Sequence, residues 1–333
     1  MKTIAVIVAC ASLILAACGG APPAAAPSPS IAPAKLIVGY SNITADVLAL
    51  WVADDTGLAR KAGLDLDARL IEGGSKTMAA LLAGEIQIGL LGGGETLSAA
   101  SQGADAVVLG TMSPVYPYVF MVPNSISTVA DLKGKKVGIS SPGGSADIAT
   151  RVLFKDIGLD PDKDVSFVAV GSHSARTAAL IAGAIQGAVD DPPQSYELES
   201  RGFRILYDLA AKKLPAAQTV IVTRKSWLDG NKVAAQRFID SLVRSFAELR
   251  RNKPPFYDAI KKYFKIEDEK TLARTYDYFV GGVYPVLPYP RAEQFTDAQA
   301  ILAQKNEKLR GFDVSKILDP SFVKSAEDRG LHK

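Results

Sequence analysis

Acidic side chains and one histidine stand next to serine- and glycine-rich segments at three places in this chain. Glu95 follows a run of three glycines, His173 lies between two serines, and Asp190 and Asp191 precede a proline. Such loops before helices leave free backbone N–H groups, which bind hydrogen-bond acceptors and anions. Carboxylates beside these groups suit a ligand that has both an acceptor end and a donor or cationic end. These four residues are therefore candidate ligand contacts.

Acid–base and metal chemistry have little support in the sequence. The chain has two histidines, His173 and His332, and His173 with Asp190 is its one plausible acid–base pair. Both cysteines, Cys10 and Cys18, lie near the start, so the remainder has no thiol for a disulfide, a nucleophile or a metal. The three consecutive glycines are not followed by the Gly-Lys-Ser/Thr of a phosphate-binding loop. We therefore expect no catalytic residue, no metal and no cofactor.

The candidate residues also have ordinary structural explanations. The segment Ser140–Ser145 could be only a turn and a helix cap, since serine and glycine are favoured there whatever the function. His173 could be a plain loop histidine, and Asp191 could simply begin a turn before Pro192. The sequence leaves these alternatives open.

Five more side chains lie near these segments. Lys76 and Arg176 fall in the first turns of expected helices, where we expect them to face solvent. Trp51 fits a core position better than a stacking platform for a ligand. Tyr116 and Tyr118 border a segment that joins the two halves of the chain, so either could face a cleft. We include Tyr116 among the candidate contacts.

The composition is that of a globular protein. Of the 333 residues, 48% are hydrophobic and 22% are charged, and the length suggests about two domains. The formal net charge is only +3, and no stripe of lysine and arginine stands out. We therefore expect no nucleic-acid partner.

The body of the chain contains an internal repeat. The segment Thr177–Gln186 follows Met78–Gln87 at a spacing of 99 residues, and seven of the ten aligned positions are identical. The same spacing aligns Val38–Ser41 with Val137–Ser140. Matches in the same order are difficult to attribute to chance, so we infer two copies of one structural unit.

Each copy predicts a strand–helix–strand–helix–strand unit, in which glycines end the helices. The expected strands are residues 36–38, 66–71 and 86–91 in the first copy and 136–139, 165–170 and 186–189 in the second. The first helix of each copy is expected at 46–62 and 146–157. Strands that alternate with helices at this spacing imply parallel sheets with right-handed crossovers.

A helical region follows the second copy, from Ser226 onward. Its expected buried face carries Val233, Phe238, Ile239, Leu242, Val243, Phe246 and Leu249.

We therefore predict an α/β protein of two lobes, each a mostly parallel sheet flanked by helices. Residues 36–121 and 222–333 form the first lobe, and residues 122–221 form the second. The chain is expected to cross between the lobes near Val119–Pro123 and again near Thr219–Thr223. Two such segments could act as a hinge.

The N-terminal segment predicts export. After a positive start, the apolar run Ile4–Ala17 is too short to span a hydrocarbon layer of ~30 Å, so residues 1–17 are expected to be a signal peptide. Leu15–Cys18 resembles the lipobox of bacterial lipoproteins, which implies lipidation of Cys18; the alternative is an ordinary cleaved signal. Residues 18–35, rich in proline and alanine, predict a tether. We expect a protein anchored to the outer face of the cytoplasmic membrane or facing the periplasm.

Several short motifs carry a family resemblance. They are Gly57–Leu64, Leu82–Gln87, Asp131–Gly138, Leu180–Gly183 and, near the C-terminus, Ile317–Phe322. Together they resemble the solute-binding proteins of ABC importers, in the branch for nitrate, aliphatic sulfonates, taurine and hydroxymethylpyrimidine-type thiamine precursors. The resemblance implies a type II periplasmic-binding fold in a monomer. Ligand would be trapped between the lobes and delivered to a membrane permease powered by a separate ATPase.

The resemblance also implies which loops contact the ligand. It adds as candidates Ser41, Asn42, Gly94, Thr96, Ser140, Ser141, Ser145 and Ser172. These loops hold no arginine or lysine, which disfavours nitrate or a simple sulfonate. A zwitterion such as taurine, or an aminopyrimidine, would use Glu95, Asp190 or Asp191 more naturally.

Two other functions remain as alternatives. One is an enzyme of pyrimidine or menaquinone synthesis on the same fold, against which the export signal and the shortage of catalytic side chains argue. The other is a sensory or interaction lipoprotein that reports its ligand state to a partner protein.

Overall fold

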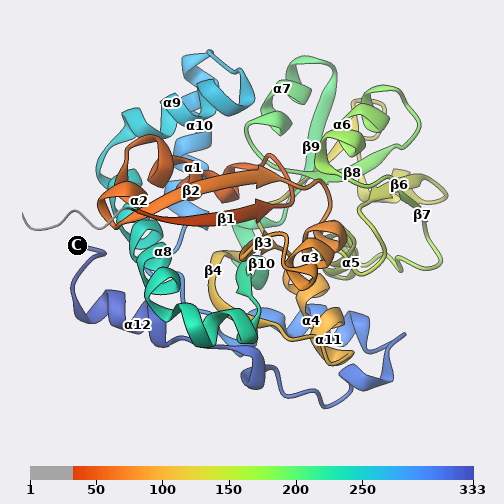
Figure 1. Cartoon of the computed structure of the whole chain (residues 1–333). Helices are drawn as coiled ribbons and strands as arrows, with labels where there is room; N and C mark the ends of the chain where they lie inside the picture. Colours follow the sequence, from red (N-terminus) through yellow and green to blue (C-terminus); the bar gives the residue numbers. More distant parts are fainter. Residues whose placement is uncertain (1–32) are drawn as a thin grey trace, which may run out of the picture. The chain divides into compact units, whose positions relative to one another are not determined.

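Two five-stranded sheets form the framework of residues 33–333, which are the residues that the computed structural model describes (Figure 1). The expected signal peptide, Cys18 and most of the expected tether lie outside this range. Strand β1 begins at Ala34, so the last two residues assigned to the tether belong to the first sheet. Within the described range, no helix is long and apolar enough to cross a membrane.

The first sheet has the strand order β2-β1-β3-β10-β4. β1 pairs in parallel with β2 and β3, while β10 runs antiparallel between β3 and β4. Four of its strands therefore point the same way. The strands are β1 (Ala34–Tyr40), β2 (Leu64–Leu70), β3 (Ile88–Leu91), β4 (Val107–Val115) and β10 (Pro215–Thr223).

The second sheet has the order β7-β6-β8-β5-β9. β6 pairs in parallel with β7 and β8, and β5 runs antiparallel between β8 and β9. This sheet matches the first strand for strand, with β5 in the place of β10, and the predicted pair of mostly parallel sheets is confirmed. The strands are β5 (Val119–Pro123), β6 (Lys136–Ile139), β7 (Ser166–Ala169), β8 (Gly187–Asp190) and β9 (Phe203–Asp208).

Residues of the internal repeat occupy equivalent places in the two sheets. Gly39 in β1 lies against Ile86, and Gly138 in β6 lies against Ile185. A Cβ atom on these glycines would stand 2.5 Å and 2.4 Å from the isoleucine Cδ1 atoms, so neither position has room for a side chain. The repeated sequence thus reflects the repeated packing of a strand against the segment that precedes its neighbour.

Helices follow the strands and flank both sheets (Figure 1). The single helix expected at 46–62 is divided, because Gly57 adopts a left-handed conformation (φ 71°) between α1 and α2. The helices of the two copies are α1 (Leu48–Asp55), α2 (Leu58–Lys61), α3 (Gly74–Ala83), α4 (Gly93–Ser101), α5 (Ser145–Asp156), α6 (His173–Ile181) and α7 (Gln194–Ser200). The C-terminal region adds α8 (Lys225–Arg251), α9 (Lys253–Phe264), α10 (Glu269–Tyr278), α11 (Thr296–Leu302) and α12 (Ser321–Asp328).

Helix α8 buries the predicted apolar face with one exception. Phe238, Ile239, Leu242 and the apolar residues that follow are buried, but Val233 is 65% exposed. Val233 precedes Leu242 by nine residues, which is two and a half turns, so it lies on the opposite side of the helix. Its assignment to the buried face was wrong.

The chain passes between the sheets at two short segments. It leaves the first sheet at the end of β4 and enters the second at Val119, and it returns between Asp208 and Pro215. The sequence places these crossings a few residues later, in segments that the structure shows to lie within β5 and β10. The second sheet is consequently built from one continuous stretch of chain.

Candidate ligand-binding site

A cavity of about 380 Å³ lies where the carboxyl ends of strands from both sheets meet. The first sheet contributes the loops after β1, β2 and β3, and the second contributes the loops after β6, β7 and β8. Ligands of open α/β sheets bind beyond the carboxyl ends of the strands. The volume is in the range of small-molecule sites.

Nine of the thirteen candidate contacts line this cavity. The first lobe supplies Ser41, Asn42 and Glu95, and the second supplies Ser140, Ser141, Ser145, Ser172, His173 and Asp191. Gly94, Thr96, Tyr116 and Asp190 do not line it.

Gly94 and Thr96 support the wall of the cavity from within α4. A Cβ atom on Gly94 would stand 2.4 Å from Cδ1 of Ile148 on α5, so this glycine permits close contact between the lobes. The hydroxyl of Thr96 donates a hydrogen bond of 3.0 Å to the carbonyl oxygen of Gly92. Neither residue presents a group to the cavity.

Tyr116 and Asp190 are buried beside the cavity. The hydroxyl of Tyr116 donates a 3.4 Å hydrogen bond to Asp297, next to a separate small space. Tyr118, the other tyrosine at the crossing, lines the main cavity instead. The carboxylate of Asp190 faces the ring of His173.

The sequence did not indicate every polar residue of the cavity. Gln218 and Thr219 belong to β10, which was treated only as a crossing segment. Asp46 is an acidic residue at the start of a helix, as Glu95 is, and this shared position was a usable signal. Tyr118 lines the cavity, as the sequence allowed, and the additional polar residues are Thr44, Asp46, Glu72, Ser75, Lys76, Arg176, Gln218 and Thr219.

Arg176 contradicts the expectation that it faces solvent. The residue is 4% exposed and lines the cavity, whereas Lys76 is exposed. Its Nη1 donates a 2.9 Å hydrogen bond to the carbonyl oxygen of Gly171, and its Nε has no partner within the described residues. A buried cation with donor capacity to spare therefore faces the cavity, because the first turn of α6 begins at the cavity rather than at the surface.

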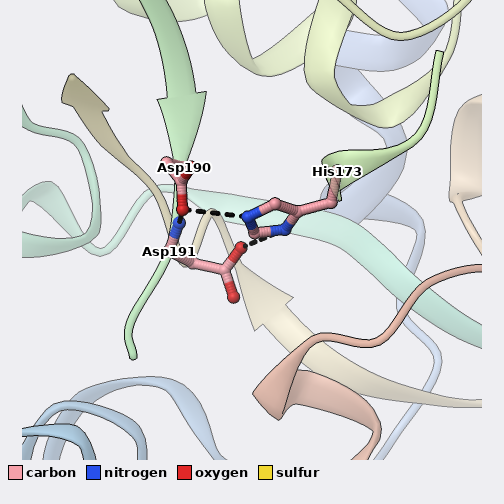
Figure 2. A group of neighbouring side chains, drawn as sticks. All are labelled: His173, Asp190 and Asp191. Atoms are coloured by element: carbon pink, nitrogen blue, oxygen red, sulfur yellow. Dashed lines mark hydrogen bonds and ion pairs between the residues drawn. The ribbon is translucent and has the colours of Figure 1, made fainter. Parts of the chain in front are cut away.

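Figure 2 shows the imidazole of His173 between the carboxylates of Asp190 and Asp191. Its Nε2 lies 2.9 Å from Oδ1 of Asp190, and its Nδ1 lies 3.2 Å from Oδ1 of Asp191. Thr177 donates a further 2.9 Å hydrogen bond to Asp190. Burial by itself would lower the pKa of His173, but the two carboxylates raise it to about 10. At neutral pH the ring is a buried cation between two anions.

This ion pair limits the chemistry of His173. A general base or a metal ligand needs a free lone pair on an imidazole nitrogen. Both nitrogens face carboxylates here, and the ring is protonated. The three side chains lie within 4.8 Å of one another, which is close enough to surround a metal ion, but their charges favour the ion pair over a metal site.

Two carboxylates at the cavity have unused acceptor atoms. Asp191 is 1% exposed, and beyond its ion pair with His173 neither oxygen accepts a hydrogen bond from the described residues. Oε2 of Glu95 is also buried and lacks a donor there. Burial raises the pKa of Asp191 to about 6 and that of Glu95 to about 7. By contrast, Asp46 accepts hydrogen bonds from Thr44 and Thr219. A cationic or N–H donor group would stabilise these two carboxylates by supplying the hydrogen bonds that they lack.

Four helices begin at the cavity. They are α3, α4, α5 and α6, and the cavity is lined by residues at or next to their first positions, including Gly74, Gly92, Ser145 and His173. Helix N-termini carry positive partial charge and unpaired N–H groups. Together with Arg176 they suit an anionic or acceptor group, so the cavity offers distinct environments to the two ends of a ligand.

Comparison with known proteins places the chain in a family. The model of the NMT1/THI5-like family matches residues 44–253, which is more than half of the chain. YtlA of Bacillus subtilis, named as a binding protein, is 24% identical over 225 residues, or 66% of this chain and 67% of YtlA. A protein of Brucella abortus, also named as a binding protein, is 32% identical over 159 residues. That match covers 45% of this chain and about half (47%) of the Brucella protein.

Solved structures show the same fold at low identity. The alkanesulfonate-binding protein SsuA from Xanthomonas axonopodis, bound to MOPS, has a TM-score of 0.70 and 21% identity, covering 87% of this chain and 99% of SsuA. The nitrate-binding protein NrtA from Synechocystis has a TM-score of 0.72 and 16% identity, covering 89% of each chain. The desulfurization enzyme DszB has a TM-score of 0.64 and 16% identity, covering 88% of this chain and 99% of DszB. One fold serves binding and catalysis here, so it does not fix function. The chain belongs to the NMT1/THI5-like family and has the two-lobed periplasmic-binding-protein fold.

Proposed function

We propose that this protein is the extracytoplasmic solute-binding component of an ABC importer. It captures a small polar solute between its lobes and delivers it to a membrane permease driven by a separate ATPase. The observation that carries the proposal is the cavity, which is built from corresponding loops of both lobes. The names of the relatives and the similarity to SsuA and NrtA support it.

The solute that suits the cavity has two unlike ends. An acceptor or anionic end would lie near Arg176 and the helix N-termini, and a cationic or N–H donor end near Asp191 and Glu95. A zwitterion such as taurine has both ends, and an aminopyrimidine offers ring acceptors with an amino donor. Nitrate and simple alkylsulfonates would supply no donor to the buried oxygens of Asp191 and Glu95 that accept no hydrogen bond from the described residues, which is costly.

Capture requires contacts from both lobes at once. Ligand favours the closed arrangement of the lobes only through contacts that the open arrangement lacks. The two crossing segments would serve as the hinge. The division of the chain into two lobes is part of this proposal, with the boundaries expected at 121/122 and 221/222 moved to the ends of β4 and β9, so that β5 belongs to the second lobe and β10 to the first.

Membrane attachment completes the proposal. Cys18 would carry the lipid, and the proline-rich residues after it would hold the binding body away from the bilayer. Cys18→Ser should move the exported protein from the membrane fraction to the soluble fraction. Retention of that variant in the membrane fraction would contradict lipid anchoring at Cys18.

The proposal is tested by ligand screening. We expect taurine or an aminopyrimidine to raise the melting temperature, since a ligand at 100 times its Kd stabilises by about 2.7 kcal/mol. Calorimetry should then show weaker binding by Asp191→Asn, while Asp229→Asn, the matched control at an exposed aspartate on α8 that does not line the cavity, binds nearly as the natural chain does. Strong binding of a simple alkylsulfonate, together with no binding of taurine or pyrimidines, would contradict this solute class.

Other functions for the same cavity have separate tests. A sensory lipoprotein would bind the solute without supporting its uptake, so uptake of labelled solute by a deletion strain distinguishes the two. If this protein shared catalytic activity as well as the fold with DszB, it would convert its bound solute to a product. The protonated ring of His173 argues against general-base catalysis, and product analysis after prolonged incubation with the bound solute checks this.

A further inference from the structure

A second cavity adjoins the first. Its volume is about 360 Å³, and the two share the lining residues Asn42, Glu72, Ser172 and His173. Residues of both lobes line it, as they do the first. A group that extends from a ligand in the first cavity past these shared residues would enter the second.

The walls of the second cavity are largely apolar. Ile43 and Ile181, from opposite lobes, are 38% and 45% exposed, which places both among the large hydrophobic side chains left accessible. The end of α9 and the turn that follows it supply Tyr263, Phe264 and Ile266. The other lining residues of α6 and α7 are small or polar: Ser174, Thr177, Ala178, Gln194 and Glu197.

The apolar wall formed by α9 is held by its own packing. Tyr263 stacks on the buried Trp51 with ring centroids 4.2 Å apart, and Phe264 meets the same indole edge-on at 5.9 Å. Lys265 ends α9 in a left-handed conformation (φ 61°), which is uncommon for a residue other than glycine. This turn separates Phe264 from Ile266, and both residues line the cavity.

We propose that the second cavity is a subsite for an apolar tail of the solute. The solute is then amphipathic, with a polar head in the first cavity and a cyclic or branched hydrocarbon group against Ile43, Ile181 and Phe264. This proposal rests on the proposed binding function only for the head group of the solute, which lies in the first cavity. Its continuity with the first cavity, and its walls from both lobes, favour the tail of a captured small molecule as the occupant.

A pair of probes with one head group tests the tail subsite. Taurine and 2-(cyclohexylamino)ethanesulfonate share an ammonium and a sulfonate, and the second compound adds a cyclohexyl ring. Burial of each methylene group is worth about fourfold in affinity (about 0.8 kcal/mol). We expect calorimetry to show at least about tenfold tighter binding of the cyclohexyl compound. If taurine binds, equal or weaker binding of the cyclohexyl compound would overturn the proposal.

Substitutions in the second cavity locate the effect. Ala178→Phe fills the cavity and Ile181→Asn makes its wall polar, so either should remove most of the advantage of the cyclohexyl compound and leave taurine binding unchanged. Val233→Asn is the matched control, since Val233 is an exposed apolar residue on α8 that lines neither cavity. An advantage that survives both substitutions would place the ring elsewhere and contradict the subsite.

A probe without a head group separates this proposal from the proposed function. Cyclohexanol should shift the Cδ1 methyl resonances of Ile43, Ile181 and Ile266 in a chain labelled at isoleucine methyl groups, and Ala178→Phe should abolish the shifts. If taurine and its cyclohexyl derivative both fail to bind, the zwitterionic head group is wrong, and the methyl shifts alone decide the subsite. Unchanged resonances would refute the apolar subsite even if taurine binds.

Discussion

Gln87 and Gln186 make the same hydrogen bond in the two lobes. Oε1 of Gln87 accepts a 2.8 Å bond from the backbone N–H of Ile37, and Oε1 of Gln186 accepts a 3.2 Å bond from the N–H of Lys136. In each lobe the bond joins the segment before the third strand to the first strand. The repeated unit thus includes a polar contact as well as an apolar core.

The two bonds should differ in their contribution to stability. The bond of Gln87 is partly buried, whereas that of Gln186 is exposed to water. An unsatisfied buried N–H costs about 1–3 kcal/mol, while water replaces an exposed partner. We expect Gln87→Ala to lower the free energy of unfolding by about 1–2 kcal/mol and Gln186→Ala by less than ~0.5 kcal/mol. Urea denaturation of both variants measures the difference, and equal losses would show that exposure does not decide it.

Gly94→Ala should hold the lobes apart. The added Cβ would lie 2.4 Å from Ile148 and 2.6 Å from the carbonyl oxygen of Gly143, both in the opposite lobe. We expect the radius of gyration from small-angle scattering to rise and ligand affinity to fall about tenfold or more, a loss of about 1.4 kcal/mol. Gly230→Ala on α8 is the control, because nothing lies within 4 Å of its Cβ position. A variant as compact as the natural chain, with undiminished affinity, would contradict the prediction.

Arg176 and Lys76 should contribute unequally to binding. Both residues line the cavity, but Arg176 is buried and its Nε has no partner among the described residues, whereas Lys76 is exposed to solvent. Hydrogen bonds to charged groups are worth about 1.5–3 kcal/mol, so Arg176→Ala should weaken binding about 10- to 100-fold. We expect less than about threefold from Lys76→Ala. Calorimetry with the solute found by screening compares them, and a larger effect at Lys76 would reverse the assignment of the anion-binding group.

The His173 cluster predicts a specific pH dependence of stability. Its pKa of about 10 in the folded protein exceeds the usual 6.5, so the folded state retains a proton that the unfolded state has lost. The stabilising effect is fully present below about pH 6.5 and is lost as the pH rises through about 10. The free energy of unfolding should therefore fall between pH 7 and pH 10, with a slope of up to about 1.4 kcal/mol per pH unit.

A neutral variant isolates that slope. The triple substitution His173→Gln, Asp190→Asn and Asp191→Asn removes the three charges together, so no buried charge is left unpaired. We expect its stability to depend less on pH between 7 and 10 than that of the natural chain. Parallel slopes in chemical denaturation would show that His173 does not hold its proton in the folded state.

The sequence predicted the parts of the fold that depend on local patterns. The repeat at Met78–Gln87 and Thr177–Gln186, with its glycines and alternating apolar runs, indicated parallel strands joined by helices in each lobe. The position of β10 between β3 and β4 could not be predicted in this way, because it pairs segments that are 100 or more residues apart. The crossings were misplaced for the same reason.

The sequence predicted the loops that line the cavity but missed the buried positive charge of Arg176. Serines and carboxylates after strands pointed to the correct edge of each sheet, since carboxyl ends of parallel strands lie together. Arg176 was missed because its burial depends on the rotation of α6 about its axis. The wall at Phe264 and Ile266 depends on how α9 packs on Trp51, a long-range contact that no local pattern encodes.

The central position of β10 also sets an order for folding. Residues 119–208 contain all strands of the second sheet, so that sheet can form as soon as this stretch is available. The first sheet has to wait for Pro215–Thr223, and until then β3 and β4 expose unpaired edges on which other strands could add. Pulsed hydrogen exchange during refolding should therefore protect the amides of β6 and β8 before those of β3. The segment synthesised first would complete its sheet last, and the interval between the two events is the period in which this chain is most exposed to aggregation.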